Sequence, residues 1–297
     1  MKKAILFLCL FAYPASNLFS QKPDSISTLR VDSGYVRVGS EKLYYEMAGE
    51  GNNIVLLHDG LIHRETWDAQ FPELAKSFRV TRYDRRGYGK SSSPQVPFSN
   101  IDDLDQLFIQ LKIDKAIVFG MSAGGGLAID FAFKHPEKVT ALVLVGAVVS
   151  GYGFSSHMLT RGGRVSVEEL MSDPQKLMKY IVSEDPYTLF SENTQAKEKF
   201  RRLLEANPQN VNMEKHKFLK PPERPALKFL SEIKVPTLVL VGEYDIPDVH
   251  AHSGVIEAGI PNAKREVILK AGHLIPLEQP EVFNTTVLAF FNERGIQ

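Results

Sequence analysis

The sequence predicts an α/β protein whose mostly parallel central sheet carries helices on both faces and is interrupted by a helical insertion. Six short runs rich in Val, Ile and Leu follow one another with helical patterns between them. Near-continuous apolar runs are typical of strands that are covered on both faces, as strands of a parallel sheet are. A stretch of roughly 80 residues without a strong strand pattern separates the fourth run from the fifth and indicates the insertion.

Residues 1–20, MKKAILFLCLFAYPASNLFS, have the pattern of a secretory signal peptide. Two lysines precede an apolar run that ends near Ala12, and small and polar residues follow to Ser20. The run is shorter than the roughly 20 residues that span a bilayer, so an uncleaved anchor is the less favoured alternative. The single cysteine, Cys9, lies in this leader, which excludes a disulfide or thiolate metal site from the mature chain. We expect export to the periplasm or outside the cell, without stable membrane insertion.

The strand signals begin with an antiparallel hairpin. The segment YVRVGSEKLYYEMAGEG (35–51) alternates apolar and polar residues and turns at Gly39-Ser40. The apolar runs that follow are NIVLLHD (53–59), FRVTRYD (78–84), KAIVFGM (115–121), TALVLVG (140–146), PTLVLVG (236–242) and KREVILK (264–270). The expected order is therefore a hairpin and then βα units.

The insertion interrupts the core between the fourth and fifth runs. It contains the helical stretches VEELMSDPQKLMKYIV (167–182) and TQAKEKFRRLLEANP (194–208). We expect it to cap the carboxyl edge of the sheet, where open α/β sheets bind ligands. The predicted organisation is a signal peptide (1–20), the first part of the core (21–147), a helical cap (148–231) and the second part of the core (232–297).

The stretch FGMSAGGGLAIDFA (119–132) joins a predicted strand to a predicted helix through Ser122. A serine at such a tight turn has strained backbone geometry, and side chains two positions before and after it would collide. Gly120 and Gly124 occupy those two positions. The pattern is weak in isolation, but between a strand and a helix it indicates a nucleophile elbow rather than a glycine-rich packing turn.

A serine nucleophile needs a histidine as base and an acid that orients it. His273 follows the last predicted strand and is the best of the eight histidines, although a loop histidine without a partner is the alternative. The other histidines of the second half, His157, His216, His250 and His252, are predicted to be surface or cap residues. For the acid we favour Asp245, which follows PTLVLVG; Asp248 is the alternative, and aspartates also commonly cap turns.

Two backbone amides are needed to hold the oxyanion. One is expected from Ala123, directly after the nucleophile, at the N-terminus of a helix. The other is expected from the loop after NIVLLH, where Gly60 is favoured and Leu61 is the near alternative. His58 is predicted to clamp that loop rather than to catalyse.

The charge balance disfavours a nucleic-acid partner. The chain has 35 Lys and Arg against 35 Asp and Glu, with no basic block. The expected partner is a small-molecule substrate, and the oligomeric state stays open.

The motifs VLLHDG, GMSAGG, LVLVGEYD and GHLIPLEQP together resemble the α/β-hydrolase fold superfamily, and DRRGYGKSS (84–92) resembles its Asp-x-Arg-Gly-x-Gly-x-Ser loop. The likeness runs from about residue 35 to 295. It implies a Ser–Asp–His hydrolase with a helical cap and no metal or organic cofactor, most like the esterase, lactonase and carbon–carbon hydrolase branch. A serine nucleophile argues against the haloalkane dehalogenase and epoxide hydrolase branches. Asp59 departs from the usual His-Gly, and we expect its carboxylate to point away from the oxyanion.

The leading functional hypothesis is hydrolysis of a small ester, lactone or related carbonyl compound through an acyl-enzyme. The same residues would also suit carbon–carbon cleavage, acyl transfer or perhydrolysis. A ligand-binding protein that keeps the fold without catalysis is the alternative from another class, because a fold alone does not prove a function.

Overall fold

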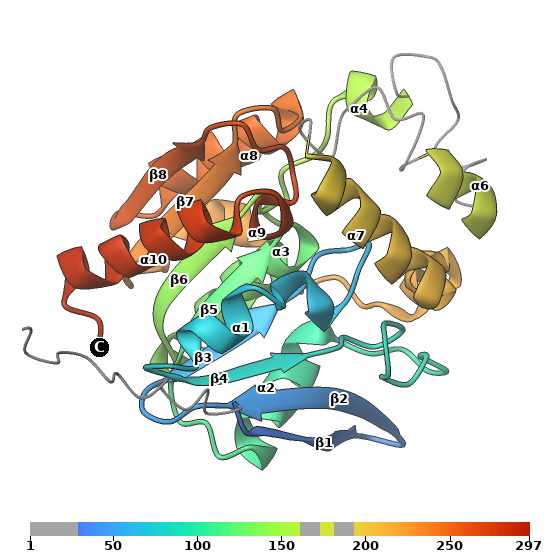
Figure 1. Ribbon diagram of the computed structural model, residues 1–297, viewed down its shortest axis with the longest axis horizontal. Coiled ribbons are helices and arrows are strands. Elements are labelled where there is room, and N and C mark those ends of the chain that lie inside the picture. Colours follow the sequence, from blue (N-terminus) through green and yellow to red (C-terminus); the bar gives the residue numbers. More distant parts are fainter. Residues whose placement is uncertain (1–28, 161–172, 181–192) are drawn as a thin grey trace, which may run out of the picture.

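The computed structural model describes residues 29–160, 173–180 and 193–297, so the predicted signal peptide lies outside the described residues. One eight-stranded sheet forms its centre, with the strand order β1-β2-β4-β3-β5-β6-β7-β8 (Figure 1). The strands are β1 (Val31–Val38), β2 (Glu41–Ala48), β3 (Asn53–Leu57), β4 (Arg79–Tyr83), β5 (Ala116–Met121), β6 (Val139–Val145), β7 (Thr237–Gly242) and β8 (Ala263–Ile268). β2 pairs antiparallel with β1 and β4, and all other pairs are parallel. The predicted fold class is confirmed.

Each of the six apolar runs forms a strand, and the predicted hairpin is β1 and β2. Gly39 at the hairpin turn has a φ of 66°, a left-handed conformation that glycine adopts without a steric penalty. The residues of β5 and β7 are buried throughout, as expected of central strands covered on both faces.

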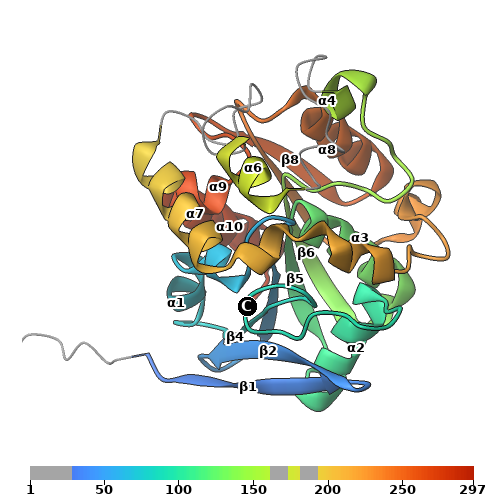
Figure 2. The ribbon, with the colours of Figure 1, turned by 90° about the vertical axis from the view of Figure 1, so that its right-hand side faces the viewer.

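Helices cover both faces of the sheet (Figure 2). Ile54 and Leu56 of β3 join the cluster of α1 (Gln70–Leu74), α9 (Ile275–Glu278) and α10 (Pro280–Arg294). Val55 and Leu57 join the cluster of α2 (Asn100–Gln110), α3 (Ala123–Lys134) and α8 (Pro247–Gly259). This alternation follows from the two-residue period of a strand. The core therefore consists of two apolar layers, one on each face.

The chain between β6 and β7 contains helices and no strand among its described residues. It includes α4 (Ser156–Thr160), α6 (Pro174–Lys179), α7 (Thr194–Ala206) and the 3₁₀ helices η5 (Pro208–Val211), η6 (Met213–Phe218) and η7 (Ala226–Glu232). α6 falls within the predicted helix 167–182, whose two ends lie outside the described residues. α7 matches its prediction: Asn193 caps it by accepting a bond from the Ala196 N–H. Figure 1 shows α4, α6 and α7 beyond the carboxyl ends of the strands.

The insertion is joined to the core by backbone and side-chain hydrogen bonds. Lys220 N–H donates to the Phe98 carbonyl at 2.8 Å. The buried Asn210 of η5 accepts a bond from the Gly89 N–H at 3.0 Å. Of the helices in the described parts of the chain, none combines the length and the apolar character that crossing a bilayer requires.

Candidate active site

Ser122 stands at a tight turn between β5 and α3. Its φ of 52° and ψ of −117° lie outside the usual regions for a residue with a side chain. A Cβ atom on Gly120 would lie 2.4 Å from the Gly124 carbonyl oxygen, and one on Gly124 would lie 2.4 Å from that of His58. Both glycines are therefore required by the backbone packing of the turn, as the sequence predicted.

His273 and Asp245 lie on loops at the carboxyl ends of β8 and β7 and contact one another. His273 Nδ1 is 2.9 Å from Asp245 Oδ2 and 3.1 Å from Oδ1, and both residues are buried. Asp245 also accepts a bond from the Ile246 N–H at 2.8 Å. The alternative acid, Asp248, instead binds Ser155 of the insertion: its Oδ2 accepts a bond from the Ser155 hydroxyl at 3.0 Å. The contacts therefore favour Asp245 over Asp248 as the orienting acid.

The turn and the His–Asp pair meet at the end of β6. The Ser122 N–H donates to the Val145 carbonyl at 2.8 Å. The next residue, Gly146, lies against the pair: a Cβ there would be 3.1 Å from His273 Nδ1 and 3.2 Å from Asp245 Oδ2. The structure thus brings Ser122, His273 and Asp245, which are far apart in the sequence, to one edge of the sheet.

The pKa of His273 is raised above its usual value of 6.5. Burial alone would lower it, because burial disfavours the charged imidazolium. The charge of Asp245 and its hydrogen bond outweigh burial, and the charges of Asp59 and Glu278 add to the increase. The Asp245 contact also sets the tautomer, because it holds the proton on Nδ1 and leaves Nε2 as the acceptor.

The loop after β3 is held by the carboxylate of Asp59. Asp59 Oδ1 accepts bonds from the N–H groups of Leu61 (2.6 Å) and Ile62 (3.0 Å), and Oδ2 accepts one from the Thr66 hydroxyl at 3.0 Å. The carboxylate is thus directed at its own loop, as expected. Because the Leu61 N–H is engaged, the Gly60 N–H, which has no acceptor among the described residues, is the better oxyanion donor. A Cβ on Gly60 would lie 3.6 Å from the Cβ of Ala123, so the two residues expected to donate to the oxyanion are neighbours in space.

Three further side chains fix the two peptides on either side of Gly60. The Arg85 N–H donates to His58 Nε2 at 3.0 Å, so the His58 proton lies on Nδ1 and is donated to the Asp59 carbonyl at 2.8 Å. Burial, followed by the charge of Arg85, lowers the pKa of His58 well below 6.5 and keeps the ring neutral. The Arg85 guanidinium also donates to the Asp59 carbonyl, and the Tyr88 hydroxyl donates to the Gly60 carbonyl at 2.9 Å. His58 is the clamp that the sequence predicted.

Arg85 and Tyr88 were not identified as site residues from the sequence. They belong to the loop DRRGYGKSS, whose motif indicated only a family resemblance. A basic and an aromatic residue in a polar loop give no signal that they reach the loop after β3, because that contact depends on β3 and β4 being neighbours in the sheet.

The prediction for His252 was wrong. It was expected at the surface or in the cap, but it lies in α8 and is 1% exposed. Its Nδ1 accepts a bond from the Val149 N–H at 3.1 Å, and its ring packs against Tyr152 and Phe154. The helical period of α8 turns His252 toward the start of the insertion. The polar character of histidine gave no indication of this burial.

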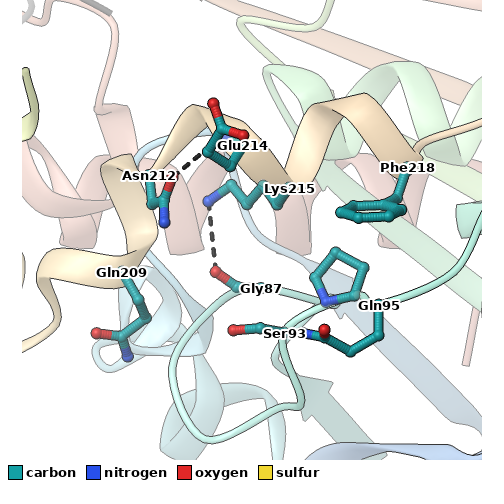
Figure 3. Close-up of a pocket in the computed structure, with 9 residues that line it drawn as sticks. Gly87, Ser93, Gln95, Gln209, Asn212, Glu214, Lys215 and Phe218 are labelled. Carbon is teal, nitrogen blue, oxygen red and sulfur yellow. Dashed lines mark hydrogen bonds between the residues drawn. The ribbon is translucent and has the colours of Figure 1, made fainter. Parts of the chain in front are cut away.

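A cavity of about 320 Å³ opens beside the two expected oxyanion donors. Gly60 and Ala123 line it, together with Arg85 and the insertion aromatics Tyr152 and Phe154. A smaller cavity of about 180 Å³ lies between η6 and the loop after β4, and neither expected oxyanion donor lines it (Figure 3). Because Gly60 and Ala123 border the 320 Å³ cavity, it is the better of these two candidates for the substrate.

Lys215 extends from η6 toward Gly87 in the smaller cavity (Figure 3). Its Nζ donates to the carbonyl oxygens of Asn210 and Gly87 and lies 3.3 Å from the centre of the Tyr88 ring. Burial, followed by the nearby charge of Arg85, lowers the pKa of this amine to about 6. Burial therefore favours the neutral amine of Lys215 over its ammonium form.

Residues 52–280 match the family model described as the alpha/beta hydrolase fold. A 2-hydroxy-6-oxononadienedioate/2-hydroxy-6-oxononatrienedioate hydrolase from Burkholderia vietnamiensis is 32% identical over 297 residues, covering 89% of this chain and 97% of the relative. The crystal structure of a hydrolase from Pseudomonas aeruginosa has a TM-score of 0.72 at 25% identity, over 88% of this chain and 98% of that chain. The enol-lactonase from Burkholderia xenovorans has a TM-score of 0.73 over 87% of this chain and 100% of that chain, and at 22% identity this likeness shows the fold alone.

Proposed function

Because the chain belongs to the α/β-hydrolase fold family, we propose that it is a serine hydrolase in which Ser122, His273 and Asp245 form the catalytic triad. The observation that carries the proposal is the 2.9 Å contact between His273 and Asp245, formed beside a strained serine turn. A histidine oriented by a buried carboxylate next to such a serine is the arrangement that acyl transfer requires.

The chemistry follows from these contacts. Ser122 Oγ attacks the substrate carbonyl carbon while His273 Nε2 takes the hydroxyl proton, and the carbonyl electrons move to oxygen. The Gly60 and Ala123 N–H groups hold this oxyanion. When the carbonyl re-forms, the bond to the leaving group breaks and His273 returns the proton to the leaving group. Water then attacks the acyl-enzyme by the same steps, which releases the acid and restores Ser122.

The substrate is a small ester, lactone or related carbonyl compound that enters the cavity beside Gly60 and Ala123. A second candidate is hydrolytic cleavage of a carbon–carbon bond in an oxo acid by the same triad. Similarity to the Burkholderia vietnamiensis relative, which is a hydrolase of oxo-dienedioates, favours it. The insertion 148–231 acts as the cap that bounds the substrate site.

Turnover of short p-nitrophenyl esters, lactones and oxo acids tests the proposal. We expect the wild type to hydrolyse at least one class, and Ser122→Ala to reduce kcat by about 10⁴-fold or more, because the nucleophile is lost. Equal rates for the two proteins would show that Ser122 is not the nucleophile.

The leader pattern of residues 1–20 further supports export of this hydrolase from the cytoplasm, and N-terminal sequencing of the released protein tests cleavage after Ser20.

A further inference from the structure

Arg85 is a buried cation without a carboxylate partner among the described residues. It is 6% exposed, and its guanidinium donates to the Asp59 carbonyl, lies over the Tyr88 ring at 4.9 Å and also interacts with the Tyr88 hydroxyl. Its Nε is buried and has no hydrogen-bond partner. An arginine offers five N–H donors, so this guanidinium is left with unused hydrogen-bonding capacity.

The other buried arginines of this region have carboxylate partners. Arg64 binds Asp84 at 2.9 Å, and Arg86 binds Asp103 at 2.6 Å. A buried charge is costly unless it is paired, and an arginine does not relieve that cost by losing its proton. Arg85 therefore keeps a positive charge in a buried place where its partners in the described chain are the Asp59 carbonyl and the Tyr88 side chain, neither of which is a carboxylate.

Arg85 also lines the 320 Å³ cavity that Gly60 and Ala123 border. Its guanidinium binds the carbonyl of the peptide whose N–H belongs to Gly60, so the charge is one peptide unit from the expected oxyanion donor. Lys220 at the cavity rim adds a second positive charge. The lining carboxylate, Asp130, accepts a bond from the Ser150 hydroxyl at 2.6 Å and forms no ion pair with Arg85.

We infer that Arg85 is the anchor of an anion subsite in this cavity, and that the substrate carries a carboxylate a few bonds from its reacting carbonyl. The carboxylate supplies the acceptor oxygens that the guanidinium lacks, and guanidinium–carboxylate pairs are strong and directional. The short distance between Arg85 and the Gly60 peptide requires the two substrate groups to be close together. The position of the reacting carbonyl rests on the proposed function, whereas the anion subsite rests on Arg85 and the cavity.

Two substrates of the same shape but different charge test this subsite. Monoethyl glutarate carries a carboxylate where its amide analogue, ethyl glutaramate, carries a neutral group. We expect the wild type to hydrolyse the glutarate with a kcat/KM about tenfold or more above that of the amide, mainly through KM. Arg85→Gln should bring this ratio close to one, Arg85→Lys should retain most of it, and the control Lys217→Gln, which removes an exposed charge outside the cavity, should leave it unchanged.

The ratio separates charge recognition from general damage, because a disturbed loop would slow both substrates alike. Calorimetric binding of both compounds to Ser122→Ala needs no turnover. If Ser122→Ala binds the glutarate more strongly than the amide, and the added Arg85→Gln substitution removes this difference, the subsite is supported. If, in addition, the wild type hydrolyses neither ester, only the proposed hydrolysis fails. Equal affinities and equal kcat/KM values for the two compounds in the wild-type series would overturn the subsite and leave the triad intact. If Arg85→Gln does not fold, the comparison of the two compounds in the wild type and in Ser122→Ala, together with Arg85→Lys, still tests the subsite.

Discussion

The basicity of His273 depends on Asp245 more than on any other neighbour. The imidazole is buried, and burial would lower its pKa, yet the adjacent carboxylate raises it above 6.5. A general base acts only in its neutral form, so a raised pKa shifts the onset of activity to higher pH. The same contact keeps Nε2 free for the serine proton. One carboxylate therefore sets both the tautomer and the working pH range.

Asp245→Asn should separate these two effects. In the wild type, kcat/KM should rise with pH through a single ionisation above pH 6.5, because the imidazolium cannot accept the Ser122 proton. The amide removes the carboxylate charge, so the ionisation should move to lower pH, and the rate on the plateau should fall by about 10³–10⁴-fold as the tautomer is lost. A pH–rate profile of both proteins measures this. An unshifted profile with a full plateau rate would show that Asp245 does not orient the base.

The side chains of the proposed triad could be indicated from the sequence, whereas the contacts that support them could not. Ser122, Asp245 and His273 each follow an apolar run, and the glycines around Ser122 added to that signal, although Asp248 stayed open as the acid. Arg85 and Tyr88 reach the loop after β3 only because β4 pairs with β3, and that pairing is not encoded locally. The burial of His252 was missed for a related reason: its partner, Val149, is distant in the sequence.

The turn between β5 and α3 depends on the absence of side chains at two positions. A Cβ on Gly124 would meet the backbone oxygens of His58 at 2.4 Å and Leu57 at 2.6 Å, and neither is a flexible side-chain end that could move aside. The same close approach brings the loop after β3 beside the N-terminus of α3. The glycine thus allows Gly60 and Ala123 to lie next to one another.

Gly124→Ala should destabilise the protein by about 3 kcal/mol or more, because the added methyl group forces backbone to move. The matched control is Gly254→Ala in α8, where a Cβ would meet nothing within 4 Å. There alanine should stabilise the helix by up to about 1 kcal/mol. Urea denaturation of both variants gives the two values. Equal effects would show that the turn tolerates a side chain.

The strands were predicted more accurately than the insertion. Central strands have continuous apolar runs, and β3 to β8 each lie within two residues of their predicted runs, whereas β1 begins at Val31, four residues before the predicted hairpin segment. In the insertion, α7 was predicted from its helical pattern. The structure buries the residues that recur at this spacing, Ala196, Phe200, Leu203 and Leu204. The 3₁₀ helices η5, η6 and η7 were not predicted, since such short elements follow the surface they pack on rather than a periodic pattern.

The parallel topology brings the proposed machinery together. The loops after β3, β5, β7 and β8 leave the same edge of the sheet, so residues between positions 60 and 273 meet there. The insertion lies over that edge and is tied to it by the bonds of Asn210 and Phe98. Strand order determines which loops are neighbours. Composition and periodicity predicted the strands, but the family resemblance was needed to anticipate how the sites on them converge.

Covalent labelling of Ser122 is the most direct test of this convergence. A fluorophosphonate reacts with a serine only when a base activates it and an oxyanion site stabilises the adduct. We expect one adduct per chain by intact mass, mapped to Ser122 by peptide mass spectrometry, and slowed by at least about 100-fold in His273→Ala. An unmodified wild-type protein, or an adduct on another residue, would contradict the proposed triad.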